Sequence, residues 1–472
     1  MHVPNRRIKV KARLISIFVV ALLTAAQAFA AHVQVIIKLE PKIDHKEVKN
    51  IAKLMGGGRV LDEIPRQNLF LIEVPEKLAE HAKFLGVHSW ETNKLVQKKL
   101  NAVKGFILSA STLTPQWYYS QPALTRIGRP AATLVSTGRG VVIADINSNV
   151  DYAHPALAGA LTSGYDFVLG RPYSLSPIML NQSDVAFLDQ SDVAFLDQSD
   201  VAFLDGVLLA TNADAATSNF LRSSGVNPVS ASSLGPQVSQ PAYSHGTLCA
   251  GMIHSIAPDS MIMPLRAFDD SGNTDLFTLA KAIDFAVANH AQVINLSFGL
   301  GADSDSIHTS LQAALNAGIT VIASAGNDNL ASDQFPASYT GVLSIAATDI
   351  ADLKGSFSNY SLSVDVSAPG VNVISSFPGG YYAVISGTSF AAPIVAGEAA
   401  LLRAMLKDPL TAIPQNTVNI DALNVNYSGR LGTGRVDLSQ AVSGPAMAPP
   451  PPPTMPPPPP PTMPPPPPPT MP

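Results

Sequence analysis

A serine in a glycine turn, directly before a long apolar run, is the feature that most constrains how this chain can fold. The run covers residues 391–406, is rich in alanine and predicts a buried helix. Ser389 is then expected at the start of that helix, where free backbone N–H groups and the positive end of the helix dipole stabilise a developing oxyanion. Gly387 allows the sharp turn, and Pro393 is tolerated in a first helical turn. The alternative is a serine that only caps a core helix.

Composition sets the broad class of the protein. The chain has 472 residues, of which 46% are hydrophobic, enough to bury one large core or two smaller ones. The formal net charge is −5 and only 14% of the residues are charged, so neither nucleic acid nor an anionic membrane surface is indicated as a partner. The single cysteine, Cys249, excludes an intramolecular disulfide framework.

The N-terminus has the pattern of a secretory signal peptide. Basic residues at positions 6–13 precede an apolar run at 14–24, and Ala28-Phe29-Ala30 offers a small-x-small cleavage site. The run is shorter than the roughly 20 apolar residues that a membrane span needs. We therefore predict that residues 1–30 are removed, that the mature protein is secreted, and that it has no membrane span.

Residues 31–100 have the pattern of a small α+β domain. Elements are expected in the order β-α-β-β-α-β, which is ferredoxin-like. The expected strands are 33–39, 59–63, 69–74 and 87–91, and the expected helices are 48–55 and 77–85. A linker without clear periodicity, residues 101–114, separates this unit from a larger domain at 115–442.

Short apolar strands alternate with amphipathic helices in the larger domain. The expected strands are 141–146, 261–268, 293–297 and 319–323, and the expected helices are 276–287 and 307–316. This alternation predicts an α/β fold with a doubly wound, mostly parallel sheet and helices on both faces. In such sheets active sites gather at the carboxyl ends of the strands.

Two low-complexity segments stand apart from this pattern. The octapeptide QSDVAFLD occurs at 182–189, 190–197 and 198–205, inside an insertion of about residues 170–240. Calcium binding by its aspartates is an alternative, but calcium loops carry closer oxygen ligands and glycine, so we predict a solvated surface loop. The tail, residues 443–472, is proline-rich and is predicted to be an extended, exposed tether.

Two further segments carry residues suited to catalysis. A serine hydroxyl is a poor nucleophile until a nearby histidine accepts its proton, and His245, within Ser244–Gly251, is the candidate base. Ala323–Asn327 follows an apolar strand, so the Asn327 amide is a candidate donor to an oxyanion. Cys249 lies one helical turn from His245, which leaves a Cys/His pair as an alternative arrangement.

Together these segments resemble the subtilisin-like serine proteases, the subtilases. Ser386–Gly397 resembles the nucleophile segment of that family, and Ser244–Gly251 matches its His-Gly-Thr-x-x-Ala-Gly pattern. The resemblance implies that Ser389 is the nucleophile, His245 the base and Asn327 the oxyanion donor, and it places Cys249 in the core. It also implies a substrate-lining edge and a facing pocket wall, formed by Ser297, Phe298, Gly299 and Gly326.

The resemblance carries further expectations about activity and regulation. It implies a secreted endopeptidase that acts on polypeptides and needs no cofactor for its chemistry, and it leaves a structural calcium ion open. Residues 31–100 are similar to the inhibitory prodomain of these enzymes. They are therefore expected to act as an intramolecular inhibitor and chaperone, released by a cut in the linker 101–114.

The chain departs from the family pattern at the residue that orients the histidine. The family has an aspartate there, whereas alignment on the downstream motif His154-Pro155 places Asn147 at this position. Asp145 points to the same face of the strand, roughly 6.5 Å away, and reaches His245 only through a bulge or a bridging group. An asparagine can hold the wrong histidine tautomer, at a cost of about 10⁴ in kcat in a related triad.

Three functions follow from this departure. The first is an active but impaired protease, with Asn147 or Asp145 orienting the base. The second is a disarmed protease fold that binds peptides. The third, an esterase, lacks the Gly-x-Ser-x-Gly elbow around Ser389. The intact Ser389 and His245 favour the first.

Overall fold

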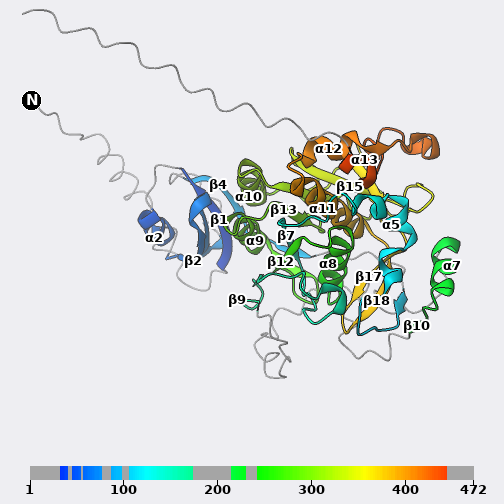
Figure 1. The fold of residues 1–472 in the computed structure, drawn as a ribbon. Helices are drawn as coiled ribbons and strands as arrows, with labels where there is room; N and C mark the ends of the chain where they lie inside the picture. Colours follow the sequence, from blue (N-terminus) through cyan, green and yellow to red (C-terminus); the bar gives the residue numbers. More distant parts are fainter. Residues whose placement is uncertain are drawn as a thin grey trace, which may run out of the picture.

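The computed structural model describes residues 32–40, 45–54, 57–76, 87–97, 106–173, 214–229 and 242–443. The signal peptide, the helix expected at 77–85, the octapeptide repeats and the proline-rich tail lie outside these ranges, so they stay predictions. Figure 1 shows a small N-terminal unit lying against helices α9 (Leu276–Ala288) and α10 (Asp305–Asn316) of a larger α/β domain.

The N-terminal unit contains a four-stranded sheet and a helix. The strands pair in the order β2-β3-β1-β4, with β1 antiparallel to both β3 and β4. Their bounds are β1 (His32–Leu39), β2 (Arg59–Ile64), β3 (Leu69–Pro75) and β4 (Val87–Thr92), and the helix is α2 (His45–Leu54). Val48 and Ala52 of α2 pack with Val35 and Ile37 of β1. These elements lie where they are expected, but the ferredoxin-like assignment stays a prediction without its second helix.

The larger domain is built on a ten-stranded sheet in the order β19-β20-β16-β15-β14-β13-β7-β11-β8-β9. The central strands pair in parallel, and only the edge pairs β8–β9 and β19–β20 are antiparallel. The central bounds are β7 (Val142–Asn147), β11 (Met261–Arg266), β13 (Val293–Leu296), β14 (Thr320–Ser324), β15 (Val342–Thr348) and β16 (Val366–Pro369). The edge strands are β8 (Tyr165–Asp166), β9 (Arg171–Pro172), β19 (Thr417–Val418) and β20 (Arg435–Val436). The predicted doubly wound, mostly parallel sheet is confirmed.

Helices cover both faces of this sheet. Ile143 and Val293 join a core cluster with α8 (His245–Ile256) and α11 (Thr388–Ala404), whereas Ala144 and Ile294 join one with α9 (Leu276–Ala288) and α10 (Asp305–Asn316). Successive side chains of a strand point to opposite faces, so both faces are buried. This burial explains why the strands are apolar throughout.

Part of the expected linker is a strand of the larger domain. β6 (Phe106–Leu108) pairs antiparallel with β18 (Tyr381–Ile385) and β10 (Pro228–Val229), and β17 (Val373–Phe377) completes this second sheet. Ile107 is buried in the same core cluster as α8 and α11. Three residues are too few to show periodicity, which is why the sequence predicted a linker over 101–114.

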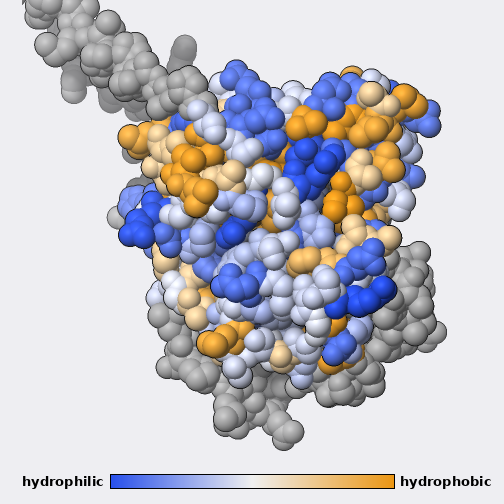
Figure 2. All heavy atoms as spheres, turned by 45° about the vertical axis from the view of Figure 1, so that its right-hand side comes forward, coloured by the Kyte–Doolittle hydropathy of each residue, from blue (hydrophilic) through white to orange (hydrophobic). Residues whose placement is uncertain are grey.

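The remaining helices are short and belong to the larger domain. They are α4 (Gln116–Tyr119), α5 (Pro122–Arg126), α6 (Arg129–Ala132), α7 (Ala215–Ser223), α12 (Pro409–Gln415) and α13 (Leu438–Ser443). On the face shown in Figure 2, hydrophobic residues are interspersed with hydrophilic ones.

Within the described ranges, no individual helix has the length and apolar character to cross a membrane; α11 and α12 meet that test only as a pair, bent by 117°.

Candidate active site

Ser389 and His245 stand in the first turns of two buried helices that pack against each other. α11 begins at Thr388 and α8 begins at His245. A Cβ atom on Gly397 would lie 2.5 Å from the Cβ of Ile256, so glycine is required for α11 to approach α8 this closely. The His245 ring lies 5.3 Å from the ring of Phe390, the residue after Ser389. The packing therefore brings the predicted nucleophile and base to one place.

Cys249 lies between these two helices and is fully buried. Its Sγ lies 3.5 Å from His245 Nδ1, and the thiol donates a hydrogen bond to the Ser389 carbonyl oxygen at 3.4 Å. It belongs to the main core cluster. The thiol therefore packs beneath the predicted nucleophile, which favours the core role over the alternative Cys/His pair.

The loop after β7 lies against the start of α8. A Cβ atom on Gly246 would lie 2.4 Å from the Asn149 carbonyl oxygen and 2.5 Å from that of Ser148, so the backbone contact requires glycine. The Gly246 N–H donates to Ser148 Oγ at 3.0 Å. This contact fixes His245 beside the carboxyl end of β7.

Asn147, the last residue of β7, contacts the histidine directly. Its Oδ1 lies 2.8 Å from His245 Nδ1 and accepts a hydrogen bond from the Ser148 N–H at 2.9 Å. Its Nδ2 donates to the two carboxylate oxygens of Asp145 at 3.3 and 3.4 Å. All three side chains are buried, with exposed fractions of 4% for His245, 1% for Asn147 and 0% for Asp145.

Asp145 connects to the histidine through Asn147 and not through a bulge. The parallel pairing of β7 with β11 and β13 runs without a register shift across Asp145. Of the two routes that the sequence left open, the structure therefore contains the bridging group, and that group is Asn147.

Asn327 follows β14 and lies beside the start of α11. Its Oδ1 accepts hydrogen bonds from the backbone N–H of Thr388 at 2.8 Å and from the Thr388 hydroxyl at 2.9 Å. Two donors on the carbonyl oxygen fix the orientation of the whole amide. The Nδ2 group is thereby held at the start of α11, where it would lie 3.8 Å from a Cβ atom on Gly387.

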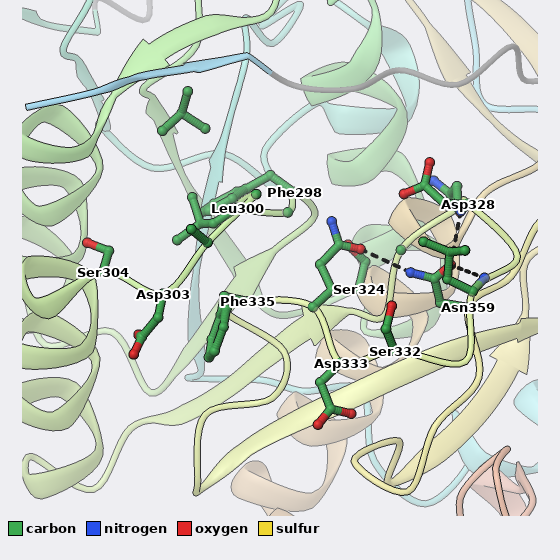
Figure 3. A pocket seen from close by; sticks show the side chains of 18 of the residues that line it. Phe298, Leu300, Asp303, Ser304, Ser324, Asp328, Ser332, Asp333, Phe335 and Asn359 are labelled. Atoms are coloured by element: carbon green, nitrogen blue, oxygen red, sulfur yellow. Dashed lines mark hydrogen bonds between the residues drawn. The ribbon is translucent and has the colours of Figure 1, made fainter.

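The predicted substrate-binding residues line one cavity with Ser389, the predicted nucleophile. The cavity has a volume of about 490 Å³, and its lining includes Ser297, Phe298, Gly299, Gly326, Asn327 and Ser389. In Figure 3, Phe298 and Leu300 lie on one side of the pocket, and Ser324 and Asn359 lie on the other. The Ser297 hydroxyl donates to the Ser389 carbonyl oxygen at 2.9 Å, and Ser389 Oγ donates to the Ser297 carbonyl oxygen at 3.3 Å. Those bonds attach the end of β13 to α11.

Sequence reasoning missed two residues of this site. Asn295 of β13 donates to Asp145 Oδ1 at 2.8 Å, and a polar residue inside an apolar strand is a signal that could have indicated a buried partner. Gln334 lies in the cavity lining, in a segment that carries no recognisable motif. A Cβ atom on Gly299 or on Gly326 would lie 1.7 Å from the Gln334 amide, so this amide lies between the two glycines.

The N-terminal unit reaches the same cavity. β5 (Leu95–Gln97) pairs antiparallel with β12 (Asn273–Asp275), and Leu95 and Val96 join the cavity lining. Glu91 accepts hydrogen bonds from the Ser306 N–H at 2.7 Å and the Ser304 hydroxyl at 3.1 Å, at the start of α10. Its carboxylate therefore meets the positive end of that helix dipole.

Ser389 and His245 lie at the starts of two buried helices, at one edge of a doubly wound sheet. This is the arrangement that the resemblance to the subtilases predicted. The chain belongs to the subtilase family, whose model matches residues 138–437. The family predicted from the sequence is therefore confirmed.

Individual relatives match part of the chain. The thermophilic serine proteinase of Bacillus sp. strain AK1 is 35% identical over 263 residues, which cover 56% of this chain and 52% of that protein. Subtilisin Savinase of Lederbergia lenta is 32% identical over 218 residues, which cover 44% of this chain and 80% of Savinase. The chain thus spans about half the length of the first of these relatives.

A solved structure shows the same fold. Fervidolysin from Fervidobacterium pennivorans, a keratinolytic enzyme related to subtilisin, aligns with a TM-score of 0.63 over 89% of this chain and 62% of its own. The two sequences are 21% identical, so this likeness concerns the fold alone.

Proposed function

We propose that the chain is a secreted serine endopeptidase that hydrolyses peptide bonds through an acyl-enzyme. Ser389 Oγ attacks the peptide carbonyl carbon while His245 Nε2 takes its proton and passes it to the leaving amine. Asn327 Nδ2 and the N–H groups at the start of α11 donate to the oxyanion. Water then hydrolyses the ester by the same steps. The signal-peptide pattern at residues 1–30 supports secretion.

The observation that carries this proposal is the 2.8 Å contact between Asn147 Oδ1 and His245 Nδ1. An acceptor at Nδ1 keeps the imidazole proton on that nitrogen, so the lone pair remains on Nε2, the nitrogen that must take the serine proton. An asparagine in this orientation does not disarm the base. The alternative, a subtilase fold that only binds peptides, is therefore less well supported.

We propose in addition that residues 31–100 inhibit the uncleaved chain. β5 pairs with β12, and its Leu95 and Val96 line the same cavity as Ser389 and the predicted substrate-lining edge Ser297–Gly299, so this segment would obstruct an extended substrate. Within the linker 101–114 we expect the cut before β6, because β6 is paired within the larger domain and would remain with it.

The test compares the full-length natural protein with Ser389→Ala and His245→Ala. We expect the natural protein to release its N-terminal unit and to hydrolyse an unfolded protein substrate. We expect both variants to stay uncleaved and to lose activity by at least about 10⁴. Equal rates for the natural protein and Ser389→Ala, with folding confirmed by circular dichroism, would overturn the proposal in favour of a binding module.

A further inference from the structure

We propose that Asp145 is a positioning residue that holds the Asn147 amide in one orientation and thereby sets the tautomer of His245. The inference rests on the proposed protease function. Asp145 does not contact the substrate in this role. It acts through Asn147, which occupies the position of the family's aspartate.

An asparagine amide can face a histidine in two ways with opposite consequences. If Oδ1 faces Nδ1, the imidazole proton stays on Nδ1 and Nε2 can act as a base. If Nδ2 faces Nδ1, the amide donates the hydrogen bond, the proton moves to Nε2, and the base is lost. Asn147 alone does not distinguish these states, because its two ends have nearly the same shape.

Two neighbours allow only the active orientation. The Ser148 N–H can only donate, so the Asn147 atom 2.9 Å away must be the acceptor Oδ1. A carboxylate can only accept, so with Asp145 ionised the Asn147 atom 3.3 Å from it is the donor Nδ2. Turning the amide over would place a donor against a donor and an acceptor against an acceptor.

Asp145 is itself held in place. It pairs directly with Asn295 across the β7–β13 ladder, and Asn295 Nδ2 donates to its Oδ1 at 2.8 Å. Asn295 Nδ2 also donates to Ser297 Oγ at 3.0 Å, and that hydroxyl donates to the Ser389 carbonyl oxygen. The bonds from Asp145 through Asn147 to His245 have a consistent direction when His245 Nδ1 carries the proton and donates to Asn147.

The negative charge of Asp145 has a second effect. His245 becomes a cation when it takes the proton of Ser389, and a buried carboxylate on the far side of the Asn147 amide favours that cation. This replaces part of the stabilisation that the family's aspartate supplies by direct contact.

The test is a cycle of four proteins: natural, Asp145→Val, Asn147→Asp and the double variant. In the natural background, we expect Asp145→Val to lower kcat by between about 10² and 10⁴ and to change KM little, because the tautomer is lost. In the Asn147→Asp background, two carboxylates would meet at the 3.3 Å that now separates Nδ2 from Oδ1, so one would be driven to bind a proton. Asp145→Val should there raise kcat. If Asp145 had only a structural role, Asp145→Val would lower kcat in both backgrounds.

Two controls keep the outcome clear. Asp145→Asn retains one acceptor and loses the charge, so it should lower kcat by less than Asp145→Val does. In proteins with ¹⁵N-labelled histidine and the Ser389→Ala change, the His245 proton should be found on Nδ1, and Asp145→Val should move it to Nε2. An active natural protein whose Asp145→Val variant keeps its kcat would overturn this inference alone, whereas a natural protein no faster than Ser389→Ala would overturn the proposed function.

A separate observation concerns specificity, and from it we infer that Gln334 restricts the cleaved bond to residues with short side chains. The Gln334 amide occupies the slot between Gly299 and Gly326, the two walls of the proposed first specificity pocket. Asn359 Nδ2 donates to Gln334 Oε1 at 3.3 Å and to the Ala325 carbonyl oxygen at 3.0 Å, which ties the amide to one wall. A large apolar side chain could enter only by displacing this amide from its partner, which is unfavourable.

The test compares peptides that differ only in alanine or phenylalanine on the carbonyl side of the cleaved bond. The natural protein should prefer alanine by at least tenfold in kcat/KM, and Gln334→Ala should raise the ratio of kcat/KM for phenylalanine to that for alanine at least tenfold. Gln312→Ala, on the exposed side of α10, serves as the matched control. A natural protein that prefers phenylalanine would overturn the inference.

Discussion

On one side of the site, Ser389 and Asn327 lie at the start of α11 and after the end of β14, in segments that match the subtilase pattern residue by residue. On the other side, β7 carries Asn147 where the family has an aspartate, and Asp145 where the interior of a strand is otherwise apolar. The first side depends on local structure, a strand end and a helix start. The second depends on hydrogen bonds between two neighbouring strands. We therefore expect substitutions on the two sides to differ in how strongly they lower kcat and in whether their effects are additive.

Among substitutions that leave Ser389, His245 and Asp145 in place, the largest effect should come from the nucleophile side. Asn327→Leu removes the amide that Thr388 holds at the start of α11, and loss of one such donor lowers kcat by about 10² to 10³ in this class of enzyme. KM should change little, because the donor acts mainly in the transition state. Steady-state kinetics on one peptide substrate would measure both constants. A rise in KM at constant kcat would mean that Asn327 binds the ground state instead.

A smaller effect is expected from the support of Asp145. Asn295→Leu removes the amide from β13 that anchors Asp145, but leaves the bond between Asp145 and Asn147 in place. We expect kcat to fall by about tenfold and the free energy of unfolding to fall by about 1–3 kcal/mol, the cost of a buried group that loses its partner. Combining Asn295→Leu with Asp145→Val should add little to the loss of kcat from Asp145→Val alone. Full additivity would show that the two residues act independently.

The sequence predicted the two sides unequally well, for a physical reason. The run of residues 391–406 and the strand before Asn327 encode their structure locally, so α11 and β14 appear where they were expected. The substitution at Asn147 was also evident from the sequence. Its consequence was not, because the orientation of the amide depends on Asn295 and on the register of β13 against β7, neither of which a local pattern contains.

Other features were hidden for the same reason. Gln334 enters the pocket because Gly299 and Gly326, from two different strand ends, leave a slot for its amide. β6 is recognisable as a strand only through its partners β10 and β18. The position of Gln334 and the formation of β6 are both determined by contacts between segments far apart in the chain.

Substituting Cys249 should change kcat little if Ser389, and not Cys249, is the nucleophile. The thiol is fully buried and donates to the Ser389 carbonyl oxygen, so it packs beneath the nucleophile and does not face the cavity. We expect Cys249→Ala to keep kcat within about threefold and thiol-alkylating reagents to leave the natural protein active. Inactivation by such a reagent, prevented by Cys249→Ala, would instead favour the Cys/His arrangement.

The smallest effect on activity, but a measurable one on stability, concerns a second buried carboxylate. Glu398 lies within α11, nine residues after Ser389, and is as fully buried as Asp145. Asp145 accepts bonds from two amides, whereas neither Glu398 oxygen has a hydrogen-bond partner among the residues that the structure describes. Burial, with a smaller contribution from the negative charge of Asp437, raises the pKa of Glu398 to about 8 from an ordinary value of 4.5.

The raised pKa of Glu398 determines how the stability of the protein changes with pH. The native state favours the protonated carboxyl, so its stabilisation is complete below pH 4.5 and is lost as the pH rises through about 8. Glu398→Gln keeps a neutral group at every pH. Its Tm should therefore match that of the natural side chain near pH 4 and exceed it by several degrees at pH 9.

The melting curves are best recorded in Ser389→Ala protein, which does not digest itself during heating. Glu40→Gln, at an exposed position, is the matched control and should show no such trend. If Glu398→Gln is less stable than the natural side chain at pH 9, the Glu398 carboxylate is charged in the native state and accepts a hydrogen bond from a donor, as Asp145 does. Both buried acids would then be hydrogen-bonded carboxylates. The two sides of the site would differ only in the residue at position 147.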